Sequence, residues 1–202
     1  MQTTVFKAIK QPLARKNICE AALTIIDQDG LHAVNMRGLA AALGVKAGSL
    51  YYHVKSKEDL LEGVAELLYK TLGPLPAEED WERQVCAIFL QMAEVAEEHP
   101  NAAPLLIDNF GKSAAAEQRA SALAAAVGRS GLDEKARARL VNNIVFLLAG
   151  YSLGNPPAGA APAAMTAWPT VWLSSQDGWE PDLALDSEFE TGMKALIKGF
   201  RV

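Results

Sequence analysis

The chain has 202 residues, half of them apolar, and its 19 basic and 24 acidic side chains give a formal net charge of −5. This length allows one large or two small domains, and the many alanines with few β-branched runs favour an all-α protein. The longest apolar runs are too short for a membrane span, and two cysteines outside any CxxC pair argue against a disulfide framework or a zinc site and for a cytoplasmic protein.

Charge is distributed unevenly along the chain. Residues 1–57 contain eight basic and three acidic side chains, a net charge of +5, whereas residues 58–202 contain 11 basic and 21 acidic ones, a net charge of −10. Such asymmetry indicates a nucleic acid or another anionic partner for the first part. A chance fluctuation in surface charge is the alternative.

The first part of the chain is expected to be a small helical unit. Apolar residues at helical spacing and flanking stop signals predict helices over 13–28, 36–43, 47–54 and 57–72. Asn35 and Ser56 are expected as N-caps, and Gly44 ends the second helix as glycines after helices often do.

A second helical unit follows the break at Gly73-Pro74-Leu75-Pro76. We expect helices over 80–98, within 99–110, over 113–127, from Asp133 to about residue 154, and a last one with Asp186 as its N-cap. Between the last two lie a low-complexity Ala/Pro/Gly loop, 154–164, and an apolar segment, 165–173.

Two short helices joined by a turn containing Gly44 form a helix-turn-helix arrangement. Small residues such as Gly48 and Ser49 at the start of its second helix would let the backbone approach the DNA major groove. Tyr51, Tyr52 and His53 would then reach base edges and phosphates, with Lys55 and Lys57 on phosphate. The alternatives are that the tyrosines cover the edge of the small core and that His53 is a solvated surface residue.

The stretch from Ala14 to Leu61 resembles the DNA-binding domain of the TetR family of bacterial transcriptional regulators. The resemblance rests on MRGLAAALGV and SLYYHVKSKEDLL after a helix that ends in DQDG, and it covers about a quarter of the chain. DWERQ and ETGMKALIKGF are similar to the tetracycline-repressor branch. The resemblance implies these DNA-facing positions: Arg37, Ala47, Gly48, Ser49, Tyr51, Tyr52, His53 and Lys57.

The chain also departs from the tetracycline-repressor branch. Ala47 and Gly48 stand where that branch has Gln and Pro, so a different operator is implied. Residues 70–73 hold no histidine, and Ile88 and Leu106 replace its drug-contacting and magnesium-binding side chains. We therefore expect no tetracycline, no metal and no cofactor.

The family's larger domain is all-helical, binds an inducer and dimerises through its last helices. The resemblance thus implies three parts: a DNA-binding domain with a basic arm (1–57), a connecting helix (58–72), and a ligand-binding and dimerisation domain (73–202). Apolar and aromatic residues expected to line the ligand site are Phe89, Met92, Leu106, Phe110, Phe146, Tyr151, Trp168 and Trp172. Residues expected at the dimer interface are Val141, Ile144, Val145, Leu148, Phe189, Met193, Leu196, Ile197 and Phe200.

The function expected is that of a homodimeric repressor, released from a pseudo-palindromic DNA operator by a small lipophilic or aromatic inducer, without a membrane partner. A constitutive DNA-binding dimer is one alternative. The other is an enzyme that uses the core pocket, but the chain contains no GxSxG, HExxH or Gly-rich phosphate-binding motif.

Overall fold

The computed structural model describes residues 13–154 and 185–200. Its elements are α1 (Arg15–Asp29), the 3₁₀ turn η1 (Leu31–Ala33), α2 (Met36–Ala42), α3 (Ala47–Tyr51), α4 (Lys57–Thr71), α5 (Trp81–Glu98), α6 (Ala103–Asp108), α7 (Ala114–Gly128), α8 (Glu134–Gly154) and α10 (Leu185–Gly199). All described elements are helical, which confirms the all-α prediction. The apolar segment 165–173, with Trp168 and Trp172, lies outside the described residues.

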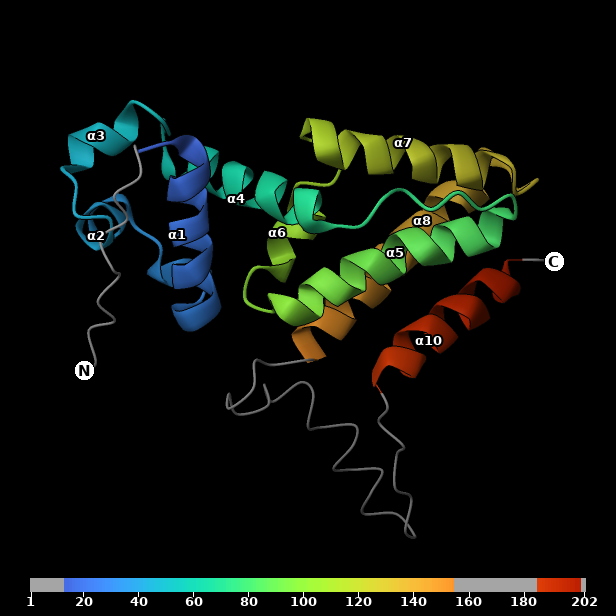
Figure 1. The fold of residues 1–202 in the computed structure, drawn as a ribbon. Helices are drawn as coiled ribbons and strands as arrows, with labels where there is room; N and C mark the ends of the chain where they lie inside the picture. The colour runs from blue at the N-terminus through green and yellow to red at the C-terminus, as the bar shows by residue number, and fades with distance from the viewer. Residues whose placement is uncertain (1–12, 155–184, 201–202) are drawn as a thin grey trace, which may run out of the picture.

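The helices form two groups that share α4. In Figure 1, α1, α2 and α3 lie together at one end of the molecule, and α4 leads from them to the larger group formed by α5 to α8 and α10. The first group, α1 to α3, is here called the head, and the larger group is called the body. The helix α4 packs against α1 of the head and against α6 and α7 of the body. It therefore connects the two groups physically as well as in sequence.

Side-chain caps explain where several helices begin. The Asn35 side chain accepts a hydrogen bond from the Gly38 N–H (2.8 Å), and the Ser56 hydroxyl accepts one from the Asp59 N–H (3.1 Å). Both predicted caps are confirmed. Asp186 was predicted to be the N-cap of the last helix. This prediction was wrong, because α10 begins at Leu185 and Asp186 lies within its first turn.

The helix α3 ends earlier than predicted, at Tyr51 rather than at residue 54. The Leu50 carbonyl accepts hydrogen bonds from both the His53 and Val54 N–H groups, each at 2.9 Å. This shared acceptor closes the helix with a turn, and Val54 is then fully buried.

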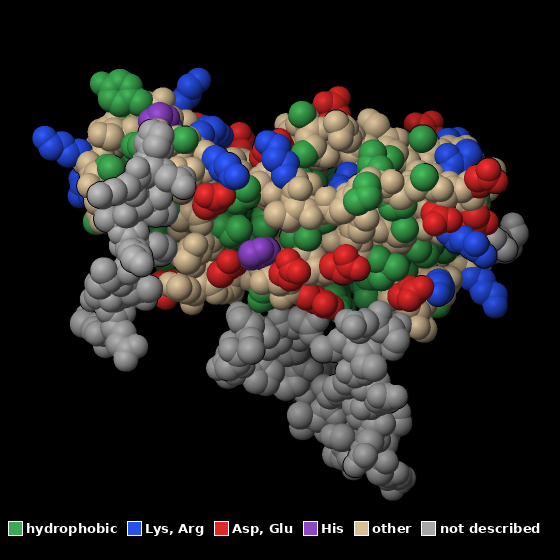
Figure 2. Space-filling view, viewed as in Figure 1, with side chains coloured by type: hydrophobic (Ala, Val, Ile, Leu, Met, Phe, Trp, Pro, Cys, Tyr) green, Lys and Arg blue, Asp and Glu red, His purple; other side chains and the backbone are tan. Residues whose placement is uncertain are grey.

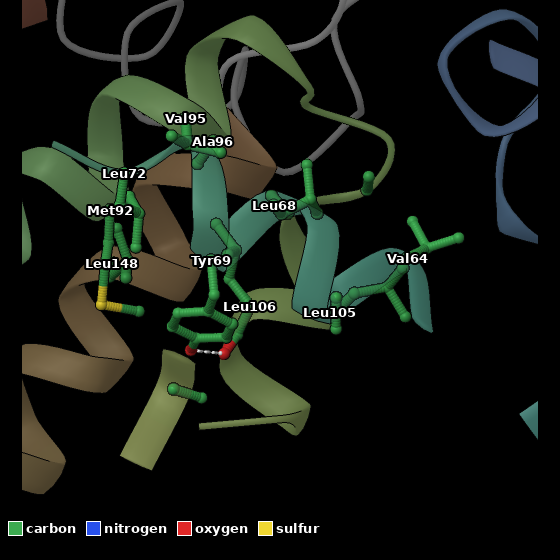
Figure 3. Close-up of a cluster of buried hydrophobic side chains, with 14 of the residues drawn as sticks. Val64, Leu68, Tyr69, Leu72, Met92, Val95, Ala96, Leu105, Leu106 and Leu148 are labelled. Atoms are coloured by element: carbon green, nitrogen blue, oxygen red, sulfur yellow. Dashed lines mark hydrogen bonds between the residues drawn. The ribbon is translucent and has the colours of Figure 1, made fainter. Parts of the chain in front are cut away.

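The body has a continuous apolar core around α4. In Figure 3, Leu68 and Tyr69 of α4 lie among Met92 of α5, Leu106 of α6 and Leu148 of α8. The Tyr69 hydroxyl donates a hydrogen bond to the Leu106 carbonyl. Burial raises the pKa of this phenol well above its ordinary value, so it stays a hydrogen-bond donor at neutral pH.

The C-terminal apolar stripe packs within its own chain. Phe189, Met193 and Ile197 of α10 are at most 2% exposed, because α10 lies against both α5 and α8. On α8, Ile144 and Leu148 are buried in the same core. The expectation that these five residues face a second copy was wrong, since α5 supplies the face that covers them. The other four predicted interface residues are partly buried against the core: Val141, Val145, Leu196 and Phe200.

Candidate nucleic-acid interface

A left-handed glycine makes the turn between α2 and α3. Gly44 has φ +68°, a conformation that glycine adopts without strain. The Gly44 N–H donates to the Ala41 carbonyl (3.1 Å) and the Val45 N–H to the Ala40 carbonyl (2.9 Å). These bonds end α2 and direct the chain into α3 at an angle.

Buried side chains hold α3 in place. Leu39 of α2, Leu50 of α3 and Val54 after α3 are all fully buried. Leu50 attaches one side of α3 to this core, and the opposite side faces outward. The helix is thus positioned by packing rather than by its own intrinsic stability.

The outward side of α3 presents two aromatic rings and a lysine. Tyr52 is 91% exposed and Tyr51 is 51% exposed. Together with Lys46, Gly48 and Ser49 they line a shallow hollow of about 390 Å³. Figure 2 shows hydrophobic side-chain atoms projecting from the end of the molecule that carries α2 and α3, close to Lys and Arg side chains. The alternative that both tyrosines cover a core edge is wrong, because almost none of Tyr52 is covered.

The structure brings together only part of the predicted DNA-facing set. Gly48, Ser49, Tyr51 and Tyr52 share the hollow, whereas the remaining four do not line it: Arg37, Ala47, His53 and Lys57. Lys57 is half-buried, and its Nζ lies 3.4 Å from the Leu31 carbonyl. The role of all eight residues in DNA binding stays a prediction.

Lys46 was missing from the predicted set although it lines the hollow and is exposed. It is the residue directly before α3. A lysine immediately before a helix that begins with small residues was the available signal. Its position makes it a further candidate for contact with phosphate.

Arg15, which the sequence did not single out, fixes the geometry of the segment that follows α3. Its guanidinium donates to the His53 carbonyl (3.1 Å), to the Asp59 carbonyl (2.9 Å) and to Asp59 Oδ1 (2.7 Å). Asp59 Oδ2 in turn accepts from the Lys55 N–H at 2.6 Å. The hydrogen bond from Arg15 is the main reason that the pKa of Asp59 is lowered, and the same bond raises the pKa of Arg15.

This arrangement, here called the Arg15–Asp59 clamp, ties the start of α1 to both ends of the 53–59 segment. It holds the end of the α3 turn and the beginning of α4 in one fixed relation. No local pattern could have predicted it, because the two residues are 44 positions apart.

None of the six described residues predicted to line a ligand site lines the hollow on α3 or the two cavities beside α4. Phe89, Met92 and Leu106 are at most 2% exposed and belong to the closed core. Phe146 is 72% exposed, so the expectation that it faces the interior was wrong. Phe110 and Tyr151 are partly buried against the core, and the Tyr151 ring lies 5.1 Å from that of Phe189.

Two cavities instead border α4. One of about 780 Å³ lies beside α1 and α4 and reaches the segment 109–113. The other, about 290 Å³, lies between the end of α4, residues 73–75 and α7. Both cavities have charged side chains in their walls. The ligand-site residues predicted from the sequence include no charged side chain.

A short helix anchored by a buried core, with an exposed polar and aromatic side and a larger helical body behind it, defines the helix-turn-helix class. Residues 18–64 match the family described as bacterial regulatory proteins, tetR family. The resemblance predicted for this part of the chain is thereby confirmed over residues 18–64.

Individual relatives agree with this assignment. An HTH-type transcriptional regulator of Saccharopolyspora erythraea is 32% identical over 97 residues, which cover 48% of this chain and 41% of that protein. The chain thus matches less than half the length of that curated relative. Two solved structures share the fold over nearly the whole chain. The Streptomyces coelicolor TetR family protein ActR in complex with actinorhodin has a TM-score of 0.72 at 24% identity, covering 94% of this chain and 97% of that one. BioQ with its double-stranded DNA operator has a TM-score of 0.66 at 21% identity, covering 94% and 98%.

Within the described residues, no helix has the length and apolarity needed to cross a membrane. The division of the chain at residues 57 and 72 stays a prediction. The family match runs to residue 64, inside α4.

Proposed function

We propose that this protein is a homodimeric transcriptional repressor that binds a pseudo-palindromic DNA operator and is released from it by a small organic ligand. The observation that carries the DNA-binding part is the exposure of Tyr51 and Tyr52 beside Lys46 on a short helix anchored by Leu50. Large exposed aromatic groups on a monomer indicate a contact surface. The solved complex of BioQ with its operator supports the same use of this fold.

The chemistry of α3 suits the major groove of DNA. Its first residues, Ala47, Gly48 and Ser49, have small side chains, so the backbone can approach base edges closely. The tyrosines offer ring edges and hydroxyl groups for base contacts, and Lys46 offers charge to phosphate. We assign sequence reading to the tyrosines and sequence-independent affinity to the lysines.

Two heads must be held at a fixed spacing to read two half-sites, which lie about 34–36 Å apart or a multiple of that distance. The outer side of α8 offers a surface for this purpose. Phe146 is 72% exposed there, and Asn142 and Gly150, one turn before and one turn after it, are also exposed. We infer that a second copy covers this face, in place of the buried stripe expected from the sequence.

Control by a ligand would act through α4, which touches both the head and the body. The complex of ActR with actinorhodin supports ligand binding within this fold. A ligand that reverses the bound state from 99:1 to 1:99 must favour the released form by about 5.5 kcal/mol. We propose regulation rather than catalysis, since the relatives are regulators.

A mobility-shift titration with DNA from upstream of the protein's own gene tests the DNA-binding proposal. We expect a complex that survives a large excess of unrelated competitor DNA and that Tyr52→Ala abolishes at the same protein concentration. Binding that competitor DNA removes as readily as unlabelled operator would contradict sequence-specific regulation. Operator binding that no small molecule weakens would support a constitutive DNA-binding dimer instead.

A further inference from the structure

Arg119 of α7 is a cation in an unusual place. It is only 4% exposed, whereas arginines are rarely buried unless they are paired with an acidic group. Its guanidinium donates to the Gln91 side-chain oxygen and to the Gly73 carbonyl. Both acceptors are neutral, so these bonds orient the guanidinium without balancing its charge.

No carboxylate within the described ranges 13–154 and 185–200 lies within 4.0 Å of this guanidinium. Arg15 provides the contrast, since Asp59 lies 2.7 Å from it. Burial lowers the pKa of Arg119, and the opposing influence comes from the Tyr69 phenol rather than from an acid. A buried charge without a counter-charge is costly, and that cost is removed if an anion binds beside it.

A cavity of about 290 Å³ lies where such an anion would bind. Arg119, Gln118 and Lys70 contribute to its polar wall, and Leu72, Pro74 and Leu75 contribute to its apolar wall. Lys70 is exposed and already pairs with Glu66 at 2.9 Å. Arg119 is therefore the uncompensated charge of this cavity.

The donors of Arg119 are only partly used. A guanidinium carries five N–H groups in a planar fork, and the two hydrogen bonds to neutral acceptors occupy one on each terminal nitrogen. A planar carboxylate matches this fork better than a spherical ion does. The apolar wall opposite would cover a hydrocarbon or aromatic body of a few carbon atoms to about one ring.

We propose that this cavity binds a small organic monocarboxylate, with its anionic group on Arg119 and its apolar part against Leu72, Pro74 and Leu75. The binding itself is independent of any DNA activity. Its role as the releasing signal rests on the proposed function, and it would act at the end of α4 farthest from the α3 head (Figure 1).

Fluorine NMR titration of the full chain with 4-fluorobenzoate and with neutral 4-fluorobenzamide, at equal ionic strength, tests the site. We expect wild type to bind the acid and to bind the amide at least tenfold more weakly. Arg119→Gln should weaken binding of the acid by roughly tenfold or more, because charge-assisted bonds are lost. Arg129→Gln, at the exposed end of the same helix, is the matched control and should bind like wild type.

Circular dichroism shows whether each variant is folded. If Arg119→Gln does not fold, Arg119→Lys keeps the charge without the planar fork and should bind the acid more weakly than wild type. The proposal is overturned if wild type fails to bind 4-fluorobenzoate at millimolar concentration. It is also overturned if the folded Arg119 variant binds as tightly as Arg129→Gln. If wild type does not bind the operator, only the proposed repressor function is contradicted. The carboxylate site is tested separately, because the titration contains no DNA.

Discussion

Arg15 Nη2 and Asp59 Oδ1 lie 2.7 Å apart and join the first turn of α1 to the first turn of α4. The pair is partly exposed, with 44% of the Arg15 side chain and 26% of the Asp59 side chain accessible. The same two side chains make further hydrogen bonds: the Arg15 guanidinium donates to the His53 carbonyl, and the Asp59 carboxylate accepts from the Lys55 N–H. Together they keep the segment after α3 in register with α4.

Asp59→Asn should therefore destabilise the protein. We expect the free energy of unfolding to fall by about 1 kcal/mol, since the lost bonds are charge-assisted but partly screened by solvent. Urea unfolding at pH 7 measures this change. Glu20→Gln is the control, because Glu20 pairs with Lys16 at 3.7 Å on the exposed surface of α1 and should cost less than about 0.5 kcal/mol. Equal losses would show that the clamp is no better than a surface pair.

The contribution of Asp59 should also depend on pH. The folded protein lowers the pKa of this carboxyl, chiefly through the Arg15 hydrogen bond, from its ordinary 3.8. The stabilisation is therefore fully present above about pH 4 and is lost as the pH falls through the lowered folded value. Urea midpoints of wild type and Asp59→Asn should differ at pH 7 and pH 5 and converge below pH 4. A difference that persists unchanged at pH 3 would mean that charge is not involved.

Lys57 and Tyr52 should act differently on DNA. Lys57→Ala should weaken binding to operator and random DNA by similar factors and lower the salt slope by roughly one to two units per dimer, because a phosphate contact is lost from each head. Tyr52→Ala should weaken operator binding more than random binding, and Tyr51→Ala should do the same. Fluorescence anisotropy over a range of salt concentrations measures both. Equal losses on both DNAs for the tyrosine variants would show that the rings do not read sequence.

Gly63 is required for the close packing of α1 on α4. A Cβ at this position would lie 2.6 Å from Cys19 Sγ and 3.2 Å from Arg15 Nη2. Gly63→Ala should therefore destabilise the protein by about 1–3 kcal/mol, as overpacked cores do, despite the better helix propensity of alanine. Adding Cys19→Ala should recover part of the loss in urea unfolding. Gly128→Ala, with open space around its Cβ, should be neutral or stabilising.

Phe146 and Ile197 separate assembly from folding. Phe146 is 72% exposed, whereas Ile197 is 2% exposed. If a second copy covers the outer side of α8, Phe146→Glu should give a folded monomer in sedimentation velocity at micromolar concentration. Ile197→Asp should unfold the chain, because it places a charge in the core. A wild type that is monomeric, or a Phe146→Glu variant that is still dimeric, would contradict this interface.

The sequence was sufficient for the features that depend on neighbouring residues. The helices of the head, the caps at Asn35 and Ser56 and the glycine turn at Gly44 all follow from local hydrogen bonding and backbone preference. The same local signals identified α3 as a part that faces outward, and the exposure of Tyr51 and Tyr52 agrees with this.

Only the tertiary structure decided which helix faces are buried against other helices and which are exposed. The sequence predicted that the α10 stripe around Met193 is an interface, but in the structure α5 and α8 cover it. The sequence also predicted that Phe146 faces the core, but in the structure it is exposed on α8. Arg15 and Arg119 read as ordinary surface arginines, yet one is clamped by a carboxylate 44 positions away and the other is buried beside a cavity. Helical periodicity shows which residues share a side of a helix, but what lies against that side depends on contacts between residues distant in the chain.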